Sequence, residues 1–282
     1  MKKIRIIAFG IIILSLSAIN IFAQEAEIVR NNLNSVEIEN IINAFTKNED
    51  DFRYALTNYV FNRSATIQTI GLGGLITGTY RRDSFLSFKK TGERFEKITY
   101  FPVPTMTEIT ITPEDLEDLG GVNPFAINPQ NAKDYTFSYI GKQKIDELNT
   151  HVFDVRPKIV NEKSKKRYFV GRIWVDDKDL MIVKSKGKGI PEGKQRFPVV
   201  ETWRTNVDGK YWFPAYSASN DELVFDNGQV IKLRLRVRYE NYQQGRSEVI
   251  ILDDVVTENE TNKDNPAENK DKTPPPAPEK KP

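Results

Sequence analysis

IKLRLRVRY, residues 231–239, is the stretch that decides the fold class of this chain. Apolar side chains at Leu233, Leu235, Val237 and Tyr239 alternate with cationic ones. This period of two predicts a β-strand with one buried face and one solvated face. The basic side chains have two interpretations, a binding stripe or a solvated outer face, and the strict alternation favours the outer face.

Similar short β-rich runs recur along the chain. They lie at residues 52–60, 65–70, 75–81, 84–88, 94–101, 134–140, 150–155, 167–175, 180–184, 199–205, 211–216 and 248–252. Asp208-Gly209 and Asn227-Gly228 are strong hairpin signals, because a tight primed turn needs positive φ. Because no long helices intervene, around a dozen strands should form one antiparallel sheet, curved or partly closed.

Two helices are expected beside the sheet. Apolar residues between positions 28 and 45 recur at spacings near 3.6, so we predict an amphipathic helix capped by Ser35 and ended by residues 48–51. A short helix is predicted at residues 112–119, where Pro113 precedes several acids. This insertion is either a lid or a plug at one end of the sheet. The predicted fold class is therefore mainly β (α+β), a curved antiparallel sheet or incomplete β-barrel with an N-terminal amphipathic helix and a short helical lid insertion.

Both ends of the chain differ from the predicted domain at residues 24–256. Residues 1–23 run from basic to apolar to small, the order of a secretory signal peptide, although an uncleaved anchor is the alternative. We therefore expect export to the periplasm. Residues 257–282 are rich in Pro, Lys and Glu and lack the apolar side chains that would offset the entropy of ordering. This segment is expected to be a solvated, disordered tail, or a spacer or docking segment.

Composition excludes several kinds of site. With Cys 0 and His 1, the chain cannot supply the usual ligands of a zinc site, and a net charge of +2 creates no field for nucleic acid. His151 lies in a predicted strand and no nucleophile elbow is present. The Gly71–Gly74 and Asp176–Asp179 stretches are interpreted as turns. We expect no metal, no cofactor and no enzymatic activity, although a glycosidase-like pair of carboxylates is not excluded by composition.

The order of several motifs resembles the LolA/LolB-like outer-membrane lipoprotein-sorting proteins. The matching stretches are residues 78–82 (GTYRR), 92–97 (GERFEK), 112–116 (TPEDL), 135–141 (YTFSYIG), 153–157 (FDVRP), 169–176 (FVGRIWVD) and 208–214 (DGKYWFP). The resemblance implies an incomplete barrel with helices across its mouth. It also implies an apolar cavity that holds the acyl chains of a lipoprotein in the periplasm. A non-catalytic envelope sensor or protein-interaction module on the same fold is the alternative function.

Candidate cavity residues follow from the strand alternation, if the curved sheet encloses a cavity and not only a packed core. The predicted lining residues are Leu233, Leu235, Val237, Tyr239, Ile173, Val175, Phe153 and Val155. The predicted rim consists of Tyr211, Trp212 and Phe213, with Arg81 or Arg82 contacting a polar group as the resemblance suggests. The expected partners are an acylated lipoprotein or lipid, other envelope proteins and, transiently, a membrane surface.

Overall fold

A computed structural model describes residues 26–89, 93–111, 115, 127–161, 166–192 and 196–245. Its helical elements are α1 (Ser35–Leu56), the short 3-10 turn η1 (Leu72–Gly74) and α3 (Pro129–Ala132). Its strands are β1 (Tyr59–Ile70), β2 (Ile76–Phe88), β3 (Arg94–Tyr100), β4 (Tyr135–Ile145), β5 (Leu148–Pro157), β6 (Tyr168–Asp176), β7 (Ile182–Ile190), β8 (Val200–Val207), β9 (Tyr211–Val224) and β10 (Val230–Gln244). The predicted signal peptide, the insertion at 112–119 apart from Asp115, the run at 248–252 and the tail lie outside the described residues.

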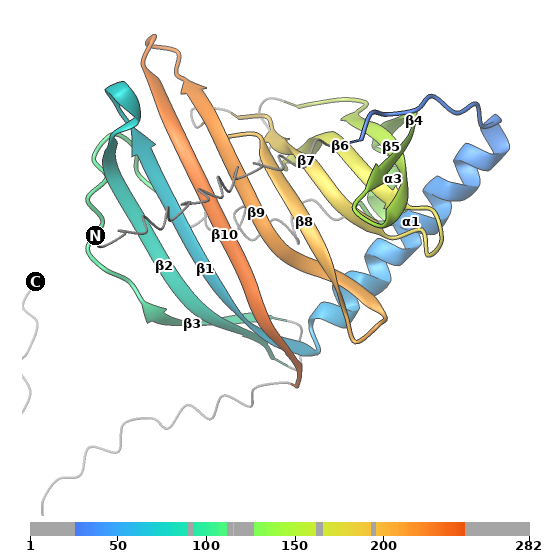
Figure 1. Ribbon diagram of the computed structural model, residues 1–282, viewed down its shortest axis with the longest axis horizontal. Helices are drawn as coiled ribbons and strands as arrows, with labels where there is room; N and C mark the ends of the chain where they lie inside the picture. Colours follow the sequence, from blue (N-terminus) through green and yellow to red (C-terminus); the bar gives the residue numbers. More distant parts are fainter. Residues whose placement is uncertain are drawn as a thin grey trace, which may run out of the picture. The chain divides into compact units, whose positions relative to one another are not determined.

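The strands form one ten-stranded sheet in the order β3-β2-β1-β10-β9-β8-β7-β6-β5-β4, and every described pair is antiparallel. The last strand therefore lies beside the first, while β3 and β4 are the two edges. The sheet is strongly curved and does not close (Figure 1). This confirms the predicted fold class, a mainly β, curved antiparallel sheet of the incomplete-barrel type.

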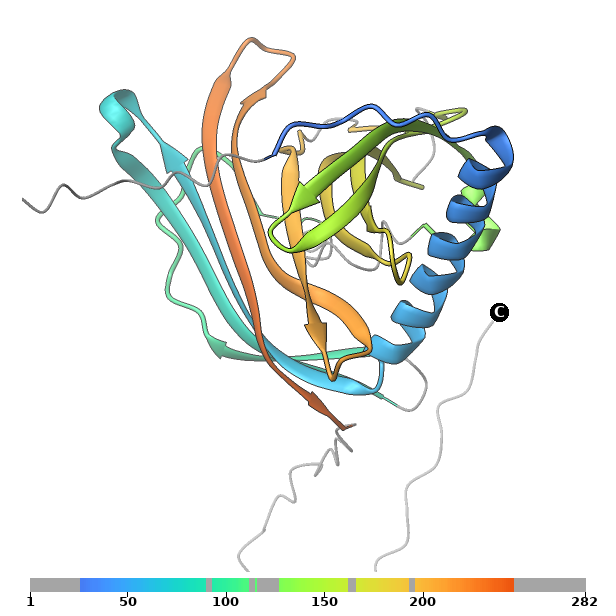
Figure 2. The same cartoon turned by 45° about the vertical axis from the view of Figure 1, so that its right-hand side comes forward.

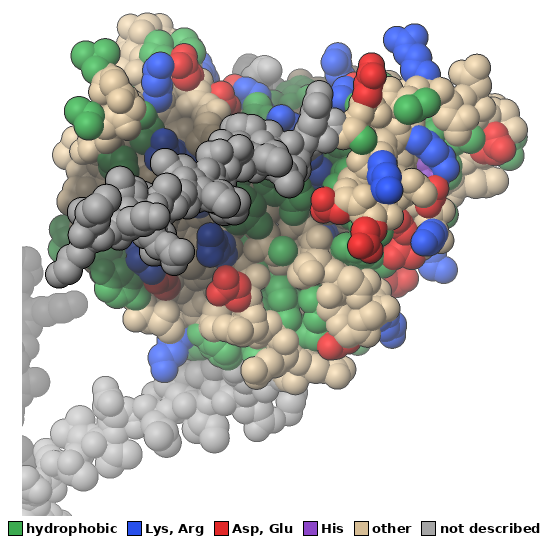
Figure 3. All heavy atoms as spheres, viewed as in Figure 1, with side chains coloured by type: hydrophobic (Ala, Val, Ile, Leu, Met, Phe, Trp, Pro, Cys, Tyr) green, Lys and Arg blue, Asp and Glu red, His purple; other side chains and the backbone are tan. Residues whose placement is uncertain are grey.

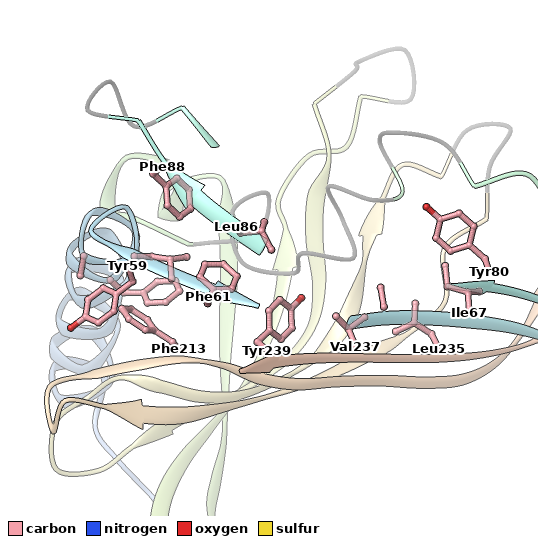
Figure 4. Packing of buried hydrophobic residues seen from close by; sticks show 14 of the residues in the cluster. Tyr59, Phe61, Ile67, Tyr80, Leu86, Phe88, Phe213, Leu235, Val237 and Tyr239 are labelled. Atoms are coloured by element: carbon pink, nitrogen blue, oxygen red, sulfur yellow. The ribbon is translucent and has the colours of Figure 1, made fainter. Parts of the chain in front are cut away.

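The central strand behaves as its alternation predicts. Leu233, Leu235, Val237 and Tyr239 are all buried, and Figure 4 shows the last three in a row on one side of β10. Leu235 lies opposite Ile67 of β1 in the register of the two strands. The cationic side chains between them therefore point to the outer face, as expected for a strand with period two.

Helix α1 covers the concave face of the sheet (Figure 2). Ile41 and Phe45 of its first half pack against β5 and β6, while Phe52 and Leu56 of its second half pack in the cluster formed with β1, β9 and β10. Burying this apolar stripe against the sheet stabilises a helix whose amphipathic face has no other partner.

Both ends of α1 differ from the sequence prediction. Asn34, not Ser35, is the N-cap: the Glu37 amide donates to Asn34 Oδ1 at 2.9 Å, and the Asn34 amide donates to the Glu37 carboxylate at 2.8 Å. This reciprocal capping box satisfies two backbone donors. The helix also continues through the polar residues at 48–51 to Leu56, so the strand predicted from residue 52 begins only at Tyr59. Burial of Phe52 on the sheet outweighs the polar pattern that suggested an earlier end.

Other predicted runs merge or shift slightly. The two strands predicted at 75–81 and 84–88 form, from Ile76 onward, the single strand β2. The polar residues between them find partners on neighbouring strands, because Arg82 pairs with Glu96 and Asp83 accepts from Ser64. Asp208 and Gly209 have φ of 54° and 66°, which confirms the predicted tight turn between β8 and β9. Within the described residues, no helix is long and apolar enough to cross a membrane.

Candidate functional site: an apolar cavity

An apolar cavity of about 340 Å³ lies on the concave face of the sheet. Its wall is formed by inward-facing side chains of six strands: Ile67 of β1, Phe169 and Ile173 of β6, Ile182 of β7, Val200 of β8, Leu223 of β9, and Leu233 and Leu235 of β10. Ligand sites typically enclose roughly 300–1,000 Å³ with mostly apolar walls and a few polar groups. The cavity is therefore large enough for one small apolar ligand.

The segment after β3 lines the cavity opposite the strands. Ile109 and Ile111 line it and pack against the buried cluster of β1, β2 and β10. The Thr105 amide donates to the Thr79 carbonyl and the Thr79 amide donates to Thr105 Oγ1, both at 3.0 Å, and these bonds hold the segment on β2. Gly78 permits the close approach, because a Cβ there would lie 2.6 Å from the Cα of Met106.

A buried ion pair lines one end of the cavity. Arg204 of β8 donates from Nη1 to Glu49 Oε1 at 2.5 Å and from Nη2 to Glu49 Oε2 at 2.9 Å. Both residues line the cavity, and their side chains are 10% and 1% exposed, respectively. The Arg204 guanidinium also donates to the Ile182 carbonyl at 3.2 Å and lies 4.5 Å from the ring centroid of Phe52. We call this pair the cavity floor.

More exposed polar groups mark the other end, which we call the mouth. Lys188 pairs with Glu192 at 3.0 Å, and Arg196 pairs with the highly exposed Asp226. Across the cavity Glu108 is exposed, and a hydrogen bond from Thr77, together with backbone donors, lowers its pKa to about 2. The mouth thus presents charges of both signs at neutral pH. Figure 3 likewise shows Lys and Arg side chains interspersed with Asp and Glu over the face it displays.

The structure brings three of the predicted lining residues to the cavity, namely Leu233, Leu235 and Ile173. The other five share the concave face but are packed into the clusters beside the cavity. Val237 and Tyr239 belong to the cluster with Phe61 and Phe213, while Phe153, Val155 and Val175 pack with Ile41 and Phe45 of α1. Complete burial raises the pKa of Tyr239 to about 12. These five residues therefore form the core that supports the wall.

The predicted rim residues do not meet at the cavity. Phe213 is fully buried against Phe52 and Tyr59, with ring centroids 5.6 and 4.8 Å apart. Tyr211 stacks on Phe213, and the indole of Trp212 donates to Asp179 at 2.8 Å. All three lie at the β8–β9 turn, since they begin β9 directly after it.

The two arginines of β2 face opposite sides of the sheet. Arg81 is exposed on the outer face, where it pairs with Asp83 at 2.8 Å. Arg82 shares the other face with the buried Tyr80 and Ser84, and it pairs with Glu96 of β3 at 2.9 Å. Strand alternation explains this difference, because adjacent side chains point to opposite faces.

Glu96 lies at the centre of a cluster of charged and polar side chains near one edge of the sheet. It also accepts from Arg63, which is almost fully buried, at 2.7 Å and from Ser84 at 2.6 Å. Burial by itself would raise the pKa of Glu96, but the hydrogen bond from Ser84 and the two arginines lower it below its ordinary value. The cluster lies outside the cavity lining.

The described residues show no arrangement typical of a metal centre. No group of three or more His, Asp or Glu side chains among them is placed to hold a metal ion. His151 is buried on β5, with Nδ1 3.3 Å from the hydroxyl of Tyr139, and burial lowers its pKa. We therefore regard it as a packed strand histidine.

Sequence reasoning missed the residues of the floor. Glu49 occupies the apolar stripe of α1, at helical spacing from Phe45 and Phe52. Arg204 alternates in phase with Val200 and Thr202 of β8, which also line the cavity. An acid on an apolar helix stripe and a base on the inner phase of a strand were the available signals, because buried charges are usually paired.

No family model matches the sequence, and no curated protein matches it. Among solved structures, a DUF1329 family protein from Desulfovibrio piger is 13% identical with a TM-score of 0.34, over 73% of this chain and 95% of that chain. A LolA superfamily protein from Nitrosomonas europaea is 12% identical with a TM-score of 0.33, over 74% and 93%. A putative outer membrane lipoprotein-sorting protein domain from Vibrio parahaemolyticus has the same identity and TM-score, over 71% and 93%. Because these TM-scores are low, the likeness carries no information about what this chain binds.

Proposed function

We propose that this protein is a non-catalytic binder of lipid or acyl chains in the bacterial periplasm. The observation that carries the proposal is the apolar cavity between α1, the segment at residues 108–111 and the inner faces of six strands. Each methylene that such a wall shields from water contributes ~0.8 kcal/mol. A cavity of this kind therefore holds a chain that would be insoluble on its own.

The finer proposal is that the protein carries acylated lipoproteins during their sorting to the outer membrane. It rests on the motif resemblance, on the signal-peptide pattern of residues 1–23 and on the cavity. A carrier must offer the acyl chains apolar surface comparable to that of the membrane throughout transfer. It contacts the membrane only to take up or release them, so we expect that contact to be transient. The alternative, an envelope sensor or interaction module on the same fold, predicts an interior without such cargo.

Native mass spectrometry with lipid extraction tests the proposal on protein purified from the envelope fraction without detergent. We expect a lipid or acylated peptide at defined stoichiometry. Leu235→Arg should remove it, because the new charge lies in the apolar wall, whereas Arg234→Gln on the opposite face of the same strand should not.

Ser185→Phe provides a second variant in case Leu235→Arg does not fold. Ser185 is half-buried and lines the cavity, so a phenyl ring there should fill it, with Ser185→Ala as the matched control. A ligand-free mass for the compact wild-type protein would contradict carriage and favour the interaction module.

A further inference from the structure

We propose that the ion pair between Glu49 and Arg204 limits the length of the chain that the cavity accepts. The ligand is then a single acyl chain of restricted length, with its polar head at the mouth and its methyl end at the floor. This inference deepens the proposed function and rests on it.

The floor is a hydrogen-bonded charged pair at the end of a mainly apolar wall. Two hydrogen bonds join the Arg204 guanidinium to Glu49, and a third joins it to the Ile182 carbonyl on the neighbouring part of the wall. Beyond it, the fully buried Phe52 and Phe213 pack tightly, with ring centroids 5.6 Å apart. The pair thus separates the open cavity from a filled apolar cluster.

The dimensions of the wall suit one extended chain. The lining residues of β7 run from Ile182 at the floor to Gly189 near the mouth, roughly 23 Å of extended strand. One acyl chain occupies about 15 Å in a bilayer leaflet, half of the hydrocarbon thickness. A chain of membrane length therefore reaches most of the way to the floor, and a longer one meets it.

The orientation follows from where the charges are accessible. Lys188 and Arg196 line the cavity with side chains 31% and 20% exposed, whereas Glu49 is 1% exposed. Arg196 donates to the Val224 carbonyl at 2.9 Å and pairs with Asp226, which is 85% exposed, so this end of the cavity is close to solvent. The accessible charged groups thus lie at the mouth, where a polar head stays in contact with water, and the chain points inward.

The floor resists a longer chain because of the energetics of buried charge. A methylene added within the apolar wall should tighten binding about fourfold, the factor equivalent to ~0.8 kcal/mol. A chain that passes the floor must separate Glu49 from Arg204 and leave both charges uncompensated, which costs several times what a methylene contributes. Affinity should therefore stop rising at a defined chain length.

The test is a titration of the ligand-depleted protein with saturated fatty acids from octanoate to eicosanoate, by isothermal calorimetry below the critical micelle concentration. We expect affinity to rise about fourfold per methylene and then reach a break. Glu49→Leu combined with Arg204→Ala removes the floor and replaces it with apolar space, so the break should move to longer chains.

A matched control removes another two-bond Arg–carboxylate pair. Arg172 donates to Asp154 at 2.7 and 3.2 Å, outside the cavity lining, so Arg172→Ala with Asp154→Leu should leave the break in place. If the floor variant does not fold, Ser185→Leu fills the cavity wall and should move the break to shorter chains.

The two proposals fail in different ways. A series without a break, or a break that neither the floor variant nor Ser185→Leu moves, overturns the chain-length limit while acyl-chain binding stands. If no fatty acid binds at any length, the proposed function itself fails, and the chain-length limit fails with it.

Discussion

Removing one partner of the Glu49–Arg204 pair should show how strongly water is excluded from the floor of the cavity. Glu49→Leu removes both carboxylate acceptors of the Arg204 guanidinium, whose side chain is 10% exposed, and leaves it the Ile182 carbonyl and the Phe52 ring. An unpaired buried charge of this kind costs about 3–5 kcal/mol of unfolding free energy. Arg204→Met should lower the unfolding free energy by a similar amount, because it leaves the Glu49 carboxylate, which is 1% exposed, without its cationic partner.

The double variant Glu49→Leu with Arg204→Met should be far more stable than the sum of the single variants. Replacing both charges with apolar groups of similar size is often neutral, so we expect a loss of at most about 1–2 kcal/mol and a large coupling energy. Urea unfolding followed by tryptophan fluorescence measures all four proteins of the cycle. If Glu49→Leu alone costs less than ~1 kcal/mol, the pair is hydrated as surface pairs are, and it is no barrier to a chain.

Three further variants test the packing and the charge of the sheet. Phe45→Ala should destabilise the protein by about 3–5 kcal/mol in chemical denaturation, because the fully buried ring contacts Phe137 and Phe153; a loss below 1 kcal/mol would contradict this packing. Gly171→Ala should cost about 1–3 kcal/mol in the same assay, since its Cβ would lie 2.2 Å from the Lys186 carbonyl oxygen; unchanged stability would refute the close approach of β6 and β7. The folded-state pKa of Glu96 lies below 4.5, so its contribution to stability is present above pH 4.5 and is lost as the pH falls through the folded value. In Glu96→Gln, unfolding curves collected from neutral to acidic pH should therefore show a weaker loss of stability below pH 4.5, and an unaltered pH profile would exclude this role.

The sequence by itself determined the fold class, because strand alternation and tight-turn chemistry are local signals. The strict period of residues 231–239 sets the inner and outer faces of β10, and Asp208-Gly209 adopts the positive φ values that the turn requires. The same alternation placed Leu233 and Leu235 on the inner face, where both line the cavity.

Only the tertiary structure decided where that face is open and where it is filled. Val237 and Tyr239 follow the same pattern as Leu235, yet they are packed into the core because the aromatic side chains of β1 and β9 lie over that part of the strand. The alternation of side chains predicts which face of the sheet a residue lies on. It does not predict how closely another strand or helix packs over that residue.

The length of α1 and the cavity floor depend on contacts between distant segments. The polar run at 48–51 predicts the end of a helix, but Glu49 is 155 residues away in sequence from the arginine that compensates its charge. Once Arg204 is beside it, burial of Glu49 is tolerated and the helix continues to bury Phe52 and Leu56. The charge of Glu49, taken from the sequence alone, argues against its burial. Arg204 compensates that charge in the structure, because the curved sheet brings it close to the helix.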